Sequence, residues 1–362
     1  MNQVLTFPRE TAVAPLTLHE HGHPHDPFEP VANPLPKLLN GEDLPSEDSE
    51  HLFERLVLGK LEPAEIAGML IALRMKGETA DEMIGAARAL SAAALPFDRP
   101  DYLYADCCGT GGDGSGLINV STATAFVAAA CGLPVAKHGN RSATSRAGAA
   151  DVLETLGVKI ELSPAQAQRC LEDAGSCFLF ARTYHPAMRH VANVRSRLGV
   201  RTIFNLLGPL SNPARVKRQL LGVYAREWIE PMAEVLAVLG TEKAWVVHGS
   251  DGLDEMTTTG ETHIASLNRG QIQLLDFDAV PRRATLADLK GGDARHNANA
   301  IKDLLEGEDG AFRDIVVLNA AAALVVADKA QSIAEGVHMA EVAIDSGAAL
   351  SRLELLVEIS NA

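Results

Sequence analysis

The residues with the clearest chemical potential are two adjacent carboxylates, Asp254 and Glu255, which follow a strand-like run. Magnesium is a hard cation that keeps several waters and takes one or two protein carboxylates together with substrate phosphates. The pair is therefore typical of a site that handles a phosphate-bearing molecule. An exposed acidic turn is the alternative interpretation, so the pair needs an anion-binding site elsewhere in the chain to support it.

A glycine-rich segment has the composition of such an anion site. Residues 106–114 read Asp-Cys-Cys-Gly-Thr-Gly-Gly-Asp-Gly, and Asn-Val-Ser-Thr at 119–122 opens a predicted helix. Glycines let the backbone turn tightly and present N–H groups to an anion, and the helix start adds donors at its positive end. The segment is neither a Walker loop nor a dinucleotide fingerprint, because Gly-Lys-Ser and G-x-G-x-x-G are missing. A flexible turn would explain the glycines alone, but the combination predicts phosphate binding.

A second polar segment follows the next strand-like run. Residues 137–145 read Lys-His-Gly-Asn-Arg-Ser-Ala-Thr-Ser and contain two cations, an imidazole, an amide and three hydroxyls. Lys137 and Arg141 suit phosphate binding, and the hydroxyls could complete a cradle. A solvated loop would explain the polarity of this segment, but not its place beside a glycine-rich turn.

The stretch from His185 to Gly208 is one of the few locally basic parts of the chain. Its arginines are Arg189, Arg195, Arg197 and Arg201. A guanidinium here could pair through two hydrogen bonds with a substrate carboxylate. A basic helix by itself is more often a solvated face.

Alternating histidines near the N-terminus are a separate feature. His19, His21, His23 and His25 are followed by Asp26, a pattern that could bind a transition metal. Prolines and the lack of helical periodicity favour a solvated, disordered extension over residues 1–32.

The remaining sequence predicts the elements that must position these groups. Residues 33–98 have a helical pattern: Pro63 can open one helix, and Thr79 with Glu82 forms a capping-box pattern before the next. From residue 99 onward, strand-like runs alternate with helices, which predicts an α/β domain with a mostly parallel central sheet covered by helices. Strands are expected at 102–107, 135–137, 177–180, 220–224, 244–248, 263–267 and 271–275. Ligands of such sheets gather beyond the carboxyl ends of the strands.

Composition excludes several classes of protein. The 362 residues are 47% hydrophobic and 22% charged, which excludes a disordered chain and favours two domains. A net charge of −15 argues against nucleic-acid and membrane partners. No apolar run reaches the roughly 20 residues of a membrane span, and no secretory signal opens the chain. Five cysteines without paired spacing are expected to be reduced thiols in a cytoplasmic protein.

Together these segments resemble the anthranilate phosphoribosyltransferases, a glycosyltransferase family related to the pyrimidine nucleoside phosphorylases. The resemblance runs from about residue 33 to the end of the chain. It rests on the glycine-rich loop, Lys-His-Gly-Asn-Arg at 137–141, Arg-Thr-Ile-Phe-Asn-Leu-Leu-Gly-Pro-Leu-Ser-Asn-Pro at 201–213, and the Asp-Glu pair. It implies that the amine of anthranilate displaces pyrophosphate from phosphoribosyl pyrophosphate, a step of tryptophan biosynthesis.

The resemblance also implies an architecture and a set of site residues. A small helical domain, 33–98 with an excursion near 188–208, would lie on an α/β domain, 99–362, and homodimers would form through the helical domains. The residues implied to bind phosphoribosyl pyrophosphate are Gly109, Gly112, Asp113, Asn119, Val120, Ser121, Thr122, Lys137, His138, Gly139, Asn140, Arg141, Ser142, Ala143, Thr144 and Ser145. Gly109, Asn140 and Arg195, with His138 nearby, would hold anthranilate. Ser121, Asp254 and Glu255 would ligate a pair of magnesium ions per subunit, and no residue is assigned as a general base.

Three other functions remain open at this point. A pyrimidine nucleoside phosphorylase would share the architecture and the phosphate loop. A related phosphoribosyltransferase could use another aromatic amine as acceptor. A non-enzymatic homologue could bind nucleic acid, although the net charge argues against it.

Four positions depart from the pattern of the family. Leu117 stands where threonine is usual, and Ala149 stands where serine is common. Asn193 and Arg197 stand where proline and an acidic residue are frequent. The first two remove possible hydrogen bonds to the phosphoribosyl donor, so we expect weaker donor binding and an unchanged reaction.

Leu117→Thr should therefore lower the KM for phosphoribosyl pyrophosphate by about 2- to 12-fold. This range corresponds to one added hydrogen bond with a net contribution of about 0.5–1.5 kcal/mol. Steady-state kinetics with varied donor measures this change. An unchanged donor KM would show that the idea is wrong.

Overall fold

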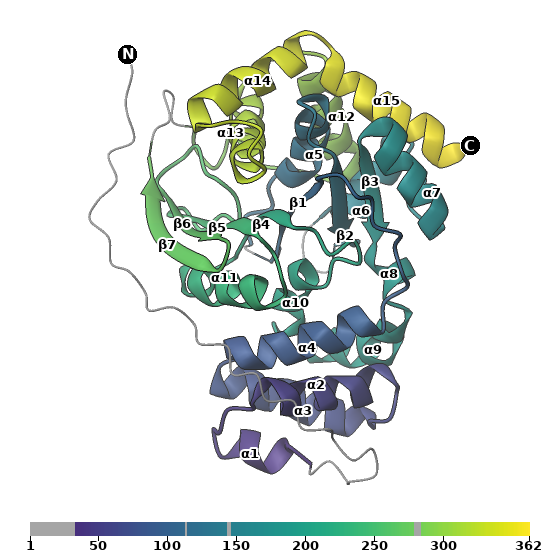
Figure 1. Cartoon of the computed structure of the whole chain (residues 1–362), viewed down its shortest axis with the longest axis vertical. Helices are drawn as coiled ribbons and strands as arrows, with labels where there is room; N and C mark the ends of the chain where they lie inside the picture. The colour runs from purple at the N-terminus through teal and green to yellow at the C-terminus, as the bar shows by residue number, and fades with distance from the viewer. Residues whose placement is uncertain (1–32, 113, 143–145, 279–283) are drawn as a thin grey trace.

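The computed structural model describes residues 33–112, 114–142, 146–278 and 284–362. A helical layer lies at one end of the molecule, and a seven-stranded sheet with helices on both faces makes up the rest (Figure 1). The proposed extension with its histidines, together with Asp113, Ala143, Thr144 and Ser145, lies outside the described residues. Within the described residues, no helix has the length and apolar character that a membrane span needs.

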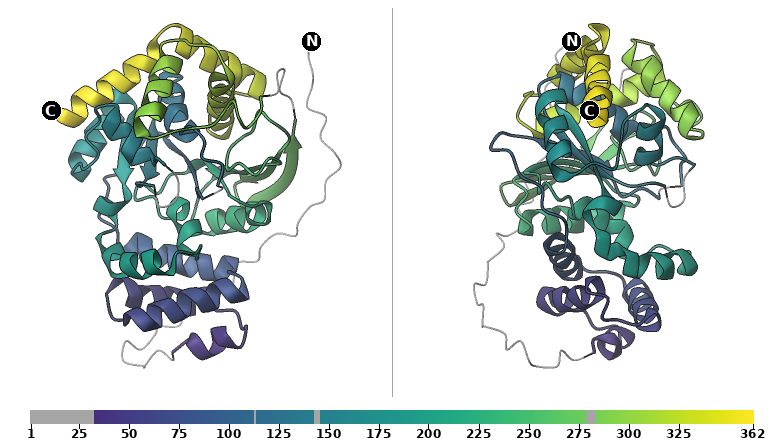
Figure 2. Two further views of the ribbon diagram at one scale, coloured as in Figure 1. Left: turned by 180° about the vertical axis from the view of Figure 1, so that it is seen from behind. Right: turned by 90° about the vertical axis from the view of Figure 1, so that its right-hand side faces the viewer.

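The helical layer consists of α1 (Leu35–Leu39), α2 (Ser46–Val57), α3 (Pro63–Lys76) and α4 (Ala80–Ala92). Figure 2 shows from two further directions that these helices stay together at one end. The predicted helix starts are confirmed: Pro63 begins α3, and Thr79 forms a capping box with Glu82 at the start of α4. The amide of Glu82 donates to Oγ1 of Thr79 at 3.3 Å, and the amide of Thr79 donates to Oε2 of Glu82 at 3.0 Å.

Glu82 also connects three parts of the helical layer. Its side chain is fully buried, where it accepts a hydrogen bond from the amide of Leu44 at 3.0 Å and pairs with Nζ of Lys76 at 3.1 Å. A buried carboxylate is tolerated only when its oxygens have such partners. Glu82, the glutamate of the capping box of α4, therefore also fixes the segment before α2 and the end of α3.

The sheet has the strand order β3-β2-β1-β4-β5-β6-β7. Its strands are β1 (Ala105–Gly109), β2 (Val135–Gly139), β3 (Ser176–Phe180), β4 (Arg218–Gly222), β5 (Lys243–Gly249), β6 (Thr262–Asn268) and β7 (Gln271–Phe277). The pairs from β3 through β5 are parallel, and β6 and β7 form an antiparallel hairpin at one edge. The predicted fold class, a helical region with a mostly parallel α/β region, is confirmed.

The other helices cover the sheet and join it to the helical layer. They are α5 (Val120–Ala130), α6 (Ala149–Thr155), α7 (Pro164–Arg169), α8 (Ala181–Tyr184), α9 (Arg189–Leu198), α10 (Phe204–Leu210), α11 (Ile229–Val238), α12 (Ala294–Leu305), α13 (Ala311–Val326), α14 (Ile333–Asp345) and α15 (Ala348–Asn361). Helices α10 and α11 lie on the face toward the helical layer, and α5 and α13 lie on the opposite face (Figure 1).

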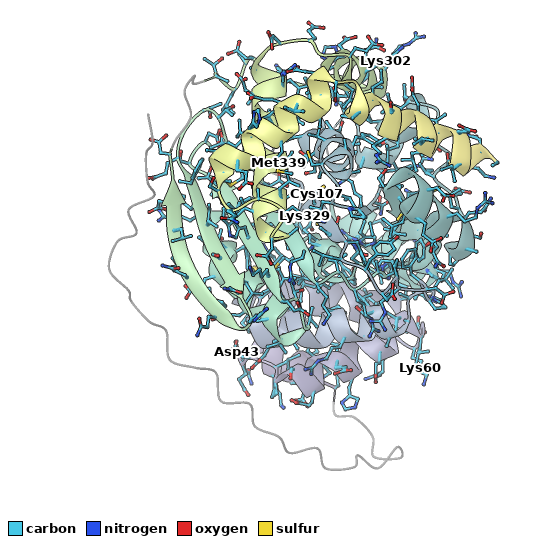
Figure 3. The ribbon with its side chains drawn as sticks, turned by 45° about the horizontal axis from the view of Figure 1, so that its top comes forward. Asp43, Lys60, Cys107, Lys302, Lys329 and Met339 are labelled. Carbon is cyan, nitrogen blue, oxygen red and sulfur yellow. The ribbon has the colours of Figure 1, made fainter. Side chains whose placement is uncertain are left out.

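One apolar cluster continues from the helical layer into the sheet. It contains Leu38 of α1, Leu90 of α4, Val191 of α9, Phe204 of α10 and Val246 of β5, all of them buried. The segment with α9 and α10 thus packs between the helical layer and the sheet. Cys107 of β1 is buried beneath the helices on the other face of the sheet (Figure 3). Asp43 and Lys60 of the helical layer and Lys302 of α12 are exposed.

Each of the seven strands differs from its predicted bounds by a few residues, and β4 lies at 218–222 instead of 220–224. The differences at β1 and β2 have clear causes. Strand β1 begins at Ala105 instead of residue 102, because its parallel ladder with β4 begins where Ala105 lies opposite Arg218. Tyr104, just before it, donates its hydroxyl to the carbonyl of Ala214 at 2.8 Å and so belongs to the connection. Strand β2 continues to Gly139, past the predicted end at residue 137, because its pairing with β3 extends to Phe180.

Gly85→Ala should destabilise the protein, because a Cβ there would lie 2.2 Å from the carbonyl oxygen of Ser46 and 2.5 Å from the amide of Glu50 on α2. Overpacking of this kind costs about 1–3 kcal/mol, which would lower the Tm by several degrees. Gly68→Ala is the matched control, since its methyl would make an ordinary 3.6 Å contact with Leu35. Equal melting temperatures for the two variants would contradict the close packing of α4 on α2.

Candidate active site

The order of the strands creates a binding position above the carboxyl ends of β1 and β4. The chain runs from β1 to β2 and β3 on one side and returns to β4 on the other side of β1. In open parallel sheets, ligands bind where the strand order reverses in this way. The glycine-rich loop leaves β1 at this point, and the amide of Thr110 donates to the carbonyl of Gly222 at 2.9 Å.

The glycine-rich loop holds Asp254. The amide of Gly111 donates to Oδ2 of Asp254 at 2.8 Å. A Cβ at Gly109 would lie 2.2 Å from that oxygen, and a Cβ at Gly222 would lie 1.6 Å from the carbonyl oxygen of Asp254. Gly222 faces backbone, so no side chain fits there, whereas a side chain at position 109 would displace the carboxylate of Asp254. The sequence predicted Gly109 as a site residue but did not single out Gly222. The one local pattern that could have indicated Gly222 is its place at the end of a strand.

Glu255 lies at the start of α5, where the helix dipole is positive. Its Oε1 accepts hydrogen bonds from the amide of Ser121 at 3.2 Å and from the hydroxyl of Ser121 at 2.6 Å. Burial, followed by repulsion from Asp254, raises the pKa of Glu255 above the ordinary carboxyl range. A divalent cation would relieve this repulsion, and two carboxylates beside a hydroxyl form a hard oxygen donor set that fits Mg²⁺. The structure brings these three residues together, and their role as metal ligands stays a prediction.

Asn319 of α13, which the sequence did not single out, holds the segment that carries the acidic pair. Its Oδ1 accepts from the amide of Met256 at 3.0 Å, and its Nδ2 donates to the carbonyl of Met256 at 2.9 Å. Before the pair, Oδ1 of Asp251 accepts from the amide of Leu253 at 3.1 Å. Hydrogen bonds on both sides of the two carboxylates limit the movement of their backbone.

Lys137 lies beneath the glycine-rich loop. It is 6% exposed, and its Nζ donates to the carbonyl oxygen of Cys107 at 2.6 Å. Nearby, the buried carboxylate of Asp106 accepts from Nδ2 of Asn212 at 2.8 Å, and burial raises its pKa despite the charge of Lys137. Lys137 therefore places a positive charge under the site in this structure, and the predicted direct contact with a phosphate stays a prediction.

His138 faces the segment that contains α10. Its Nδ1 lies 3.0 Å from the carbonyl oxygen of Gly208, and its ring lies edge-on to His185 with 5.2 Å between the centroids. Burial, and then the neighbouring His185, lowers the pKa of His138 to about 3, so the imidazole is neutral near pH 7. Nδ1 must carry the proton to bond the Gly208 carbonyl, which leaves Nε2 as a hydrogen-bond acceptor. Among the described residues nothing bonds this buried Nε2.

Arg141 differs from the free phosphate-binding cation that the sequence suggested. Its guanidinium pairs with Asp151 at 2.9 Å and with Glu154 at 2.5 Å and 2.8 Å. Asp151 also accepts from the amide of Ser142 at 3.2 Å, which fixes the start of the polar loop. Asn140 is exposed beside it, and Gly139 ends β2. The contact of Arg141 with a phosphate stays a prediction that requires these ion pairs to be shared or broken.

The start of α5 is held by contacts within the protein. Val120 and Thr122 are each 2% exposed, and their amides donate to the carbonyls of Ile118 and Asn119, so their predicted contact with the donor stays a prediction. Asn119 precedes them, and its Oδ1 accepts from Nδ2 of Asn297 at 2.9 Å. Asn297 of α12 also accepts from the amide of Gly292 at 2.8 Å. Asn297 thus positions Asn119, a role that no local sequence pattern reveals.

The two substitutions expected to weaken donor binding lie against the core. The side chains of Leu117 and Ala149 are partly buried and pack on the main apolar cluster. The backbone of Leu117 also forms an antiparallel bridge with Lys290. A threonine at position 117 would therefore exchange some packing for a hydroxyl.

The basic segment contributes two arginines that reach the site from the side of the helical layer. The guanidinium of Arg195 lies 5.0 Å from the ring centre of Phe204, and burial lowers its pKa. Arg201 lies 4.4 Å from the ring centre of Tyr224, and its Nη2 donates to the carbonyl oxygen of Gly112. Asn193 and Arg197, the other two departures from the family pattern, are exposed on α9.

Comparison with known proteins agrees with this arrangement. Residues 35–94 match the helical bundle domain of the glycosyl transferase family, and residues 101–350 match its a/b domain. The helical layer, the strand reversal with its glycine-rich loop and the partly buried acidic pair thus belong to a member of this transferase family.

The similar proteins are anthranilate phosphoribosyltransferases. That of Methylocella silvestris is 52% identical and covers 90% of this chain and 94% of its own. The structure of the Thermus thermophilus enzyme has a TM-score of 0.85 and 44% identity over 91% of this chain and 100% of its own. The structure of the Saccharomyces cerevisiae enzyme in complex with PRPP and Mg has a TM-score of 0.83 and 29% identity, and the match covers 91% of this chain and 98% of that enzyme. The chain belongs to the anthranilate phosphoribosyltransferase family.

Arg201→Met should loosen the glycine-rich loop, because it removes both the hydrogen bond to Gly112 and the stacking on Tyr224. We expect the affinity for inorganic pyrophosphate, measured by calorimetry, to fall about tenfold. Arg197→Met removes the same charge from an exposed position and serves as the control. An equal loss of affinity in both variants would assign the effect to net charge instead of the contact with Gly112.

Proposed function

We propose that the chain transfers the phosphoribosyl group of phosphoribosyl pyrophosphate to the amine of anthranilate. The products are N-(5-phosphoribosyl)anthranilate and pyrophosphate, the second step of tryptophan biosynthesis from chorismate. The observation that carries the proposal is the meeting of the acidic pair with the glycine-rich loop and the start of α5, through Gly111 to Asp254 and Ser121 to Glu255.

The reaction forms a bond between the amine nitrogen and C1 of the ribose while the bond from C1 to the pyrophosphate oxygen breaks. The electron pair of the broken bond leaves with pyrophosphate, and the amine nitrogen loses one proton. When bound, Mg²⁺ neutralises the negative charge that develops on the departing group. Ser121, Asp254 and Glu255 would hold a pair of such ions per subunit, directly or through water.

The donor would bind along the loops that follow β1 and β2. The partial positive charge at the start of α5 favours an anion there, while the amides of Gly111 and Ser121 hold Asp254 and Glu255 beside it. Lys137 supplies a positive charge beneath them. The proposed contacts are Gly109, Gly112, Asn119, Val120, Ser121, Thr122, Lys137, His138, Gly139, Asn140, Arg141 and Ser142, with Asp113, Ala143, Thr144 and Ser145 outside the described residues.

Anthranilate would lie between the end of β2 and the segment of α9 and α10. Arg195 suits its carboxylate, and the unoccupied acceptor at Nε2 of His138 suits an N–H of its amine. Gly109 and Asn140 would complete the contacts. An aromatic amine is neutral near pH 7, so orientation at C1 supplies much of the acceleration, and no general base is assigned.

The arrangement of the subunit is part of the same proposal. We divide the chain into a helical domain, 33–98 with the excursion near 188–208, and an α/β domain, 99–362. Several large apolar side chains of the helical domain are exposed, including Leu39, Leu58 and Met75, which supports a homodimer formed through this domain. We further propose a cytoplasmic location.

Three assays separate the proposal from its alternatives. Phosphorolysis of thymidine or uridine would indicate a pyrimidine nucleoside phosphorylase. Turnover with another aromatic amine, but none with anthranilate, would indicate a changed acceptor. A salt-dependent mobility shift with single-stranded DNA would indicate a nucleic-acid-binding protein.

Glu255→Gln should lower kcat/KM for anthranilate by about 100-fold or more, because a neutral amide is a poor ligand for a hard cation. The loss of anthranilate fluorescence in the presence of donor and Mg²⁺ measures turnover. Removal of the metal by a chelator should abolish the wild-type signal, and added Mg²⁺ should restore it.

Glu308→Gln is the control, since it removes one charge from an exposed position. It should leave kcat/KM unchanged. Equal activity of the two variants, or full turnover by chelated enzyme, would contradict the assignment of the acidic pair.

A further inference from the structure

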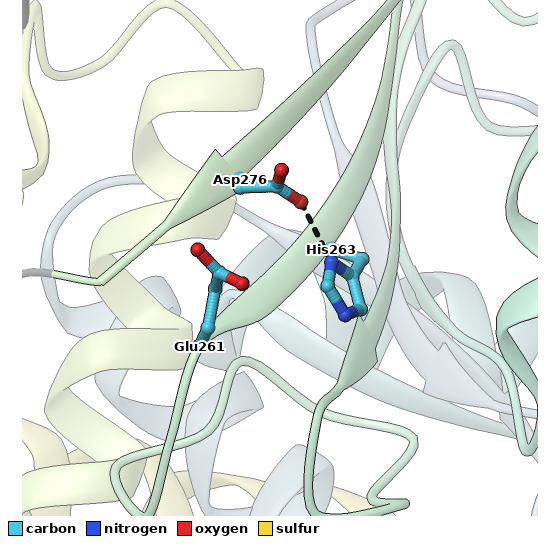
Figure 4. A group of neighbouring side chains, drawn as sticks. All are labelled: Glu261, His263 and Asp276. Carbon is cyan, nitrogen blue, oxygen red and sulfur yellow. Dashed lines mark hydrogen bonds and ion pairs between the residues drawn. The ribbon is translucent and has the colours of Figure 1, made fainter.

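A second group of potential metal ligands lies on the antiparallel hairpin at the edge of the sheet. His263 of β6 lies directly opposite Asp276 of β7 in the strand register. Glu261 lies just before β6, two residues from His263. Figure 4 shows the two carboxylates and the imidazole converging from these neighbouring segments.

The three side chains lie close enough that small rotations would bring one ligand atom of each around a single ion. Nδ1 of His263 lies 2.6 Å from Oδ1 of Asp276, and one ligand atom from each of the three residues lies within 4.8 Å of the others. The side chain of His263 is 10% exposed, whereas that of Asp276 is 55% exposed. The imidazole is therefore fixed by its surroundings, and the two carboxylates leave one side open to solvent for water ligands.

The two carboxylates give this group a negative charge that a cation would offset. An N–H at Nδ1 of His263 donates a hydrogen bond to Asp276 only. The carboxylate of Glu261 then remains as a further negative charge. In the described part of the chain, no basic side chain forms an ion pair with Glu261. One divalent ion would be coordinated by all three side chains. The set of one imidazole nitrogen and two carboxylate oxygens suits zinc and similar transition metals, whereas Mg²⁺ favours oxygen alone.

We propose that Glu261, His263 and Asp276 bind one divalent transition-metal ion. This site is separate from Asp254 and Glu255 in its ligands and in the metals that it favours. It also adjoins the loop that carries them, because the carbonyl of Glu261 accepts from the amide of Ser250 at 2.8 Å. A bound ion would join β6 to β7 and hold the point where this loop returns to the sheet.

The test is a titration with Co²⁺, followed by its visible absorption bands. It uses the full chain with His19, His21, His23 and His25 changed to glutamine, so that the N-terminal histidines contribute no binding. Saturating Mg²⁺ occupies the acidic pair of the candidate active site. We expect one Co²⁺ per chain, with the band positions of a mixed nitrogen and oxygen ligand set, and displacement of Co²⁺ by Zn²⁺.

His263→Gln in the same background should weaken Co²⁺ binding at least tenfold and remove the band that arises from the imidazole. His296→Gln, which changes an exposed histidine of α12, is the matched control and should leave binding unchanged. If His263→Gln does not fold by circular dichroism, Glu261→Gln tests the same site from an exposed position. Binding of Co²⁺ with equal affinity in all of these variants, or no binding in any, would overturn the proposal and leave a simple hydrogen bond between His263 and Asp276.

Discussion

The close approach of Asp254 to the ends of β1 and β4 is the contact on which the rest of the site depends. Gly109 and Gly222 belong to different strands, and a Cβ on either would collide with Asp254. Because both positions are glycine, Asp254 can accept the amide of Gly111, and Glu255 can reach the start of α5. The acidic pair and the donors of the glycine-rich loop are thereby held together before any ligand binds.

This arrangement also explains how an acidic protein can hold an anionic substrate. The net charge of −15 acts over the whole surface and is screened by salt, whereas the groups at the site act at short range. Lys137 is buried below the glycine-rich loop, and Arg201 contacts that loop from above through Gly112. The start of α5 adds its partial positive charge. The same elements suit both a metal ion and the phosphates that it would accompany.

The helical layer takes part in the site because it shares a core with the sheet. The apolar cluster that contains Leu90 and Val246 runs from the helical layer into the sheet. Packing of α9 and α10 within this cluster fixes Arg195 and the carbonyl of Gly208, to which His138 is bonded. The acceptor side of the candidate site is therefore positioned by the core that the helical layer and the sheet share. The metal ligands proposed on β6 and β7 would add a further constraint at the edge of the same sheet.

The sequence by itself determined the class of fold and the position of the motifs, because strand ends, glycines and polar clusters are local patterns. Parallel strands bring their carboxyl ends to one edge, so motifs that follow strands had to meet. Tertiary structure alone decided where the side chains point. Arg141, predicted to bind phosphate, pairs with Glu154 in the structure, and Asn319 reaches Met256 across 63 residues of sequence. The space available at Gly222 likewise depends on a loop that arrives from a distant segment. Such contacts depend on neighbours that only the complete fold supplies, and no local periodicity encodes them.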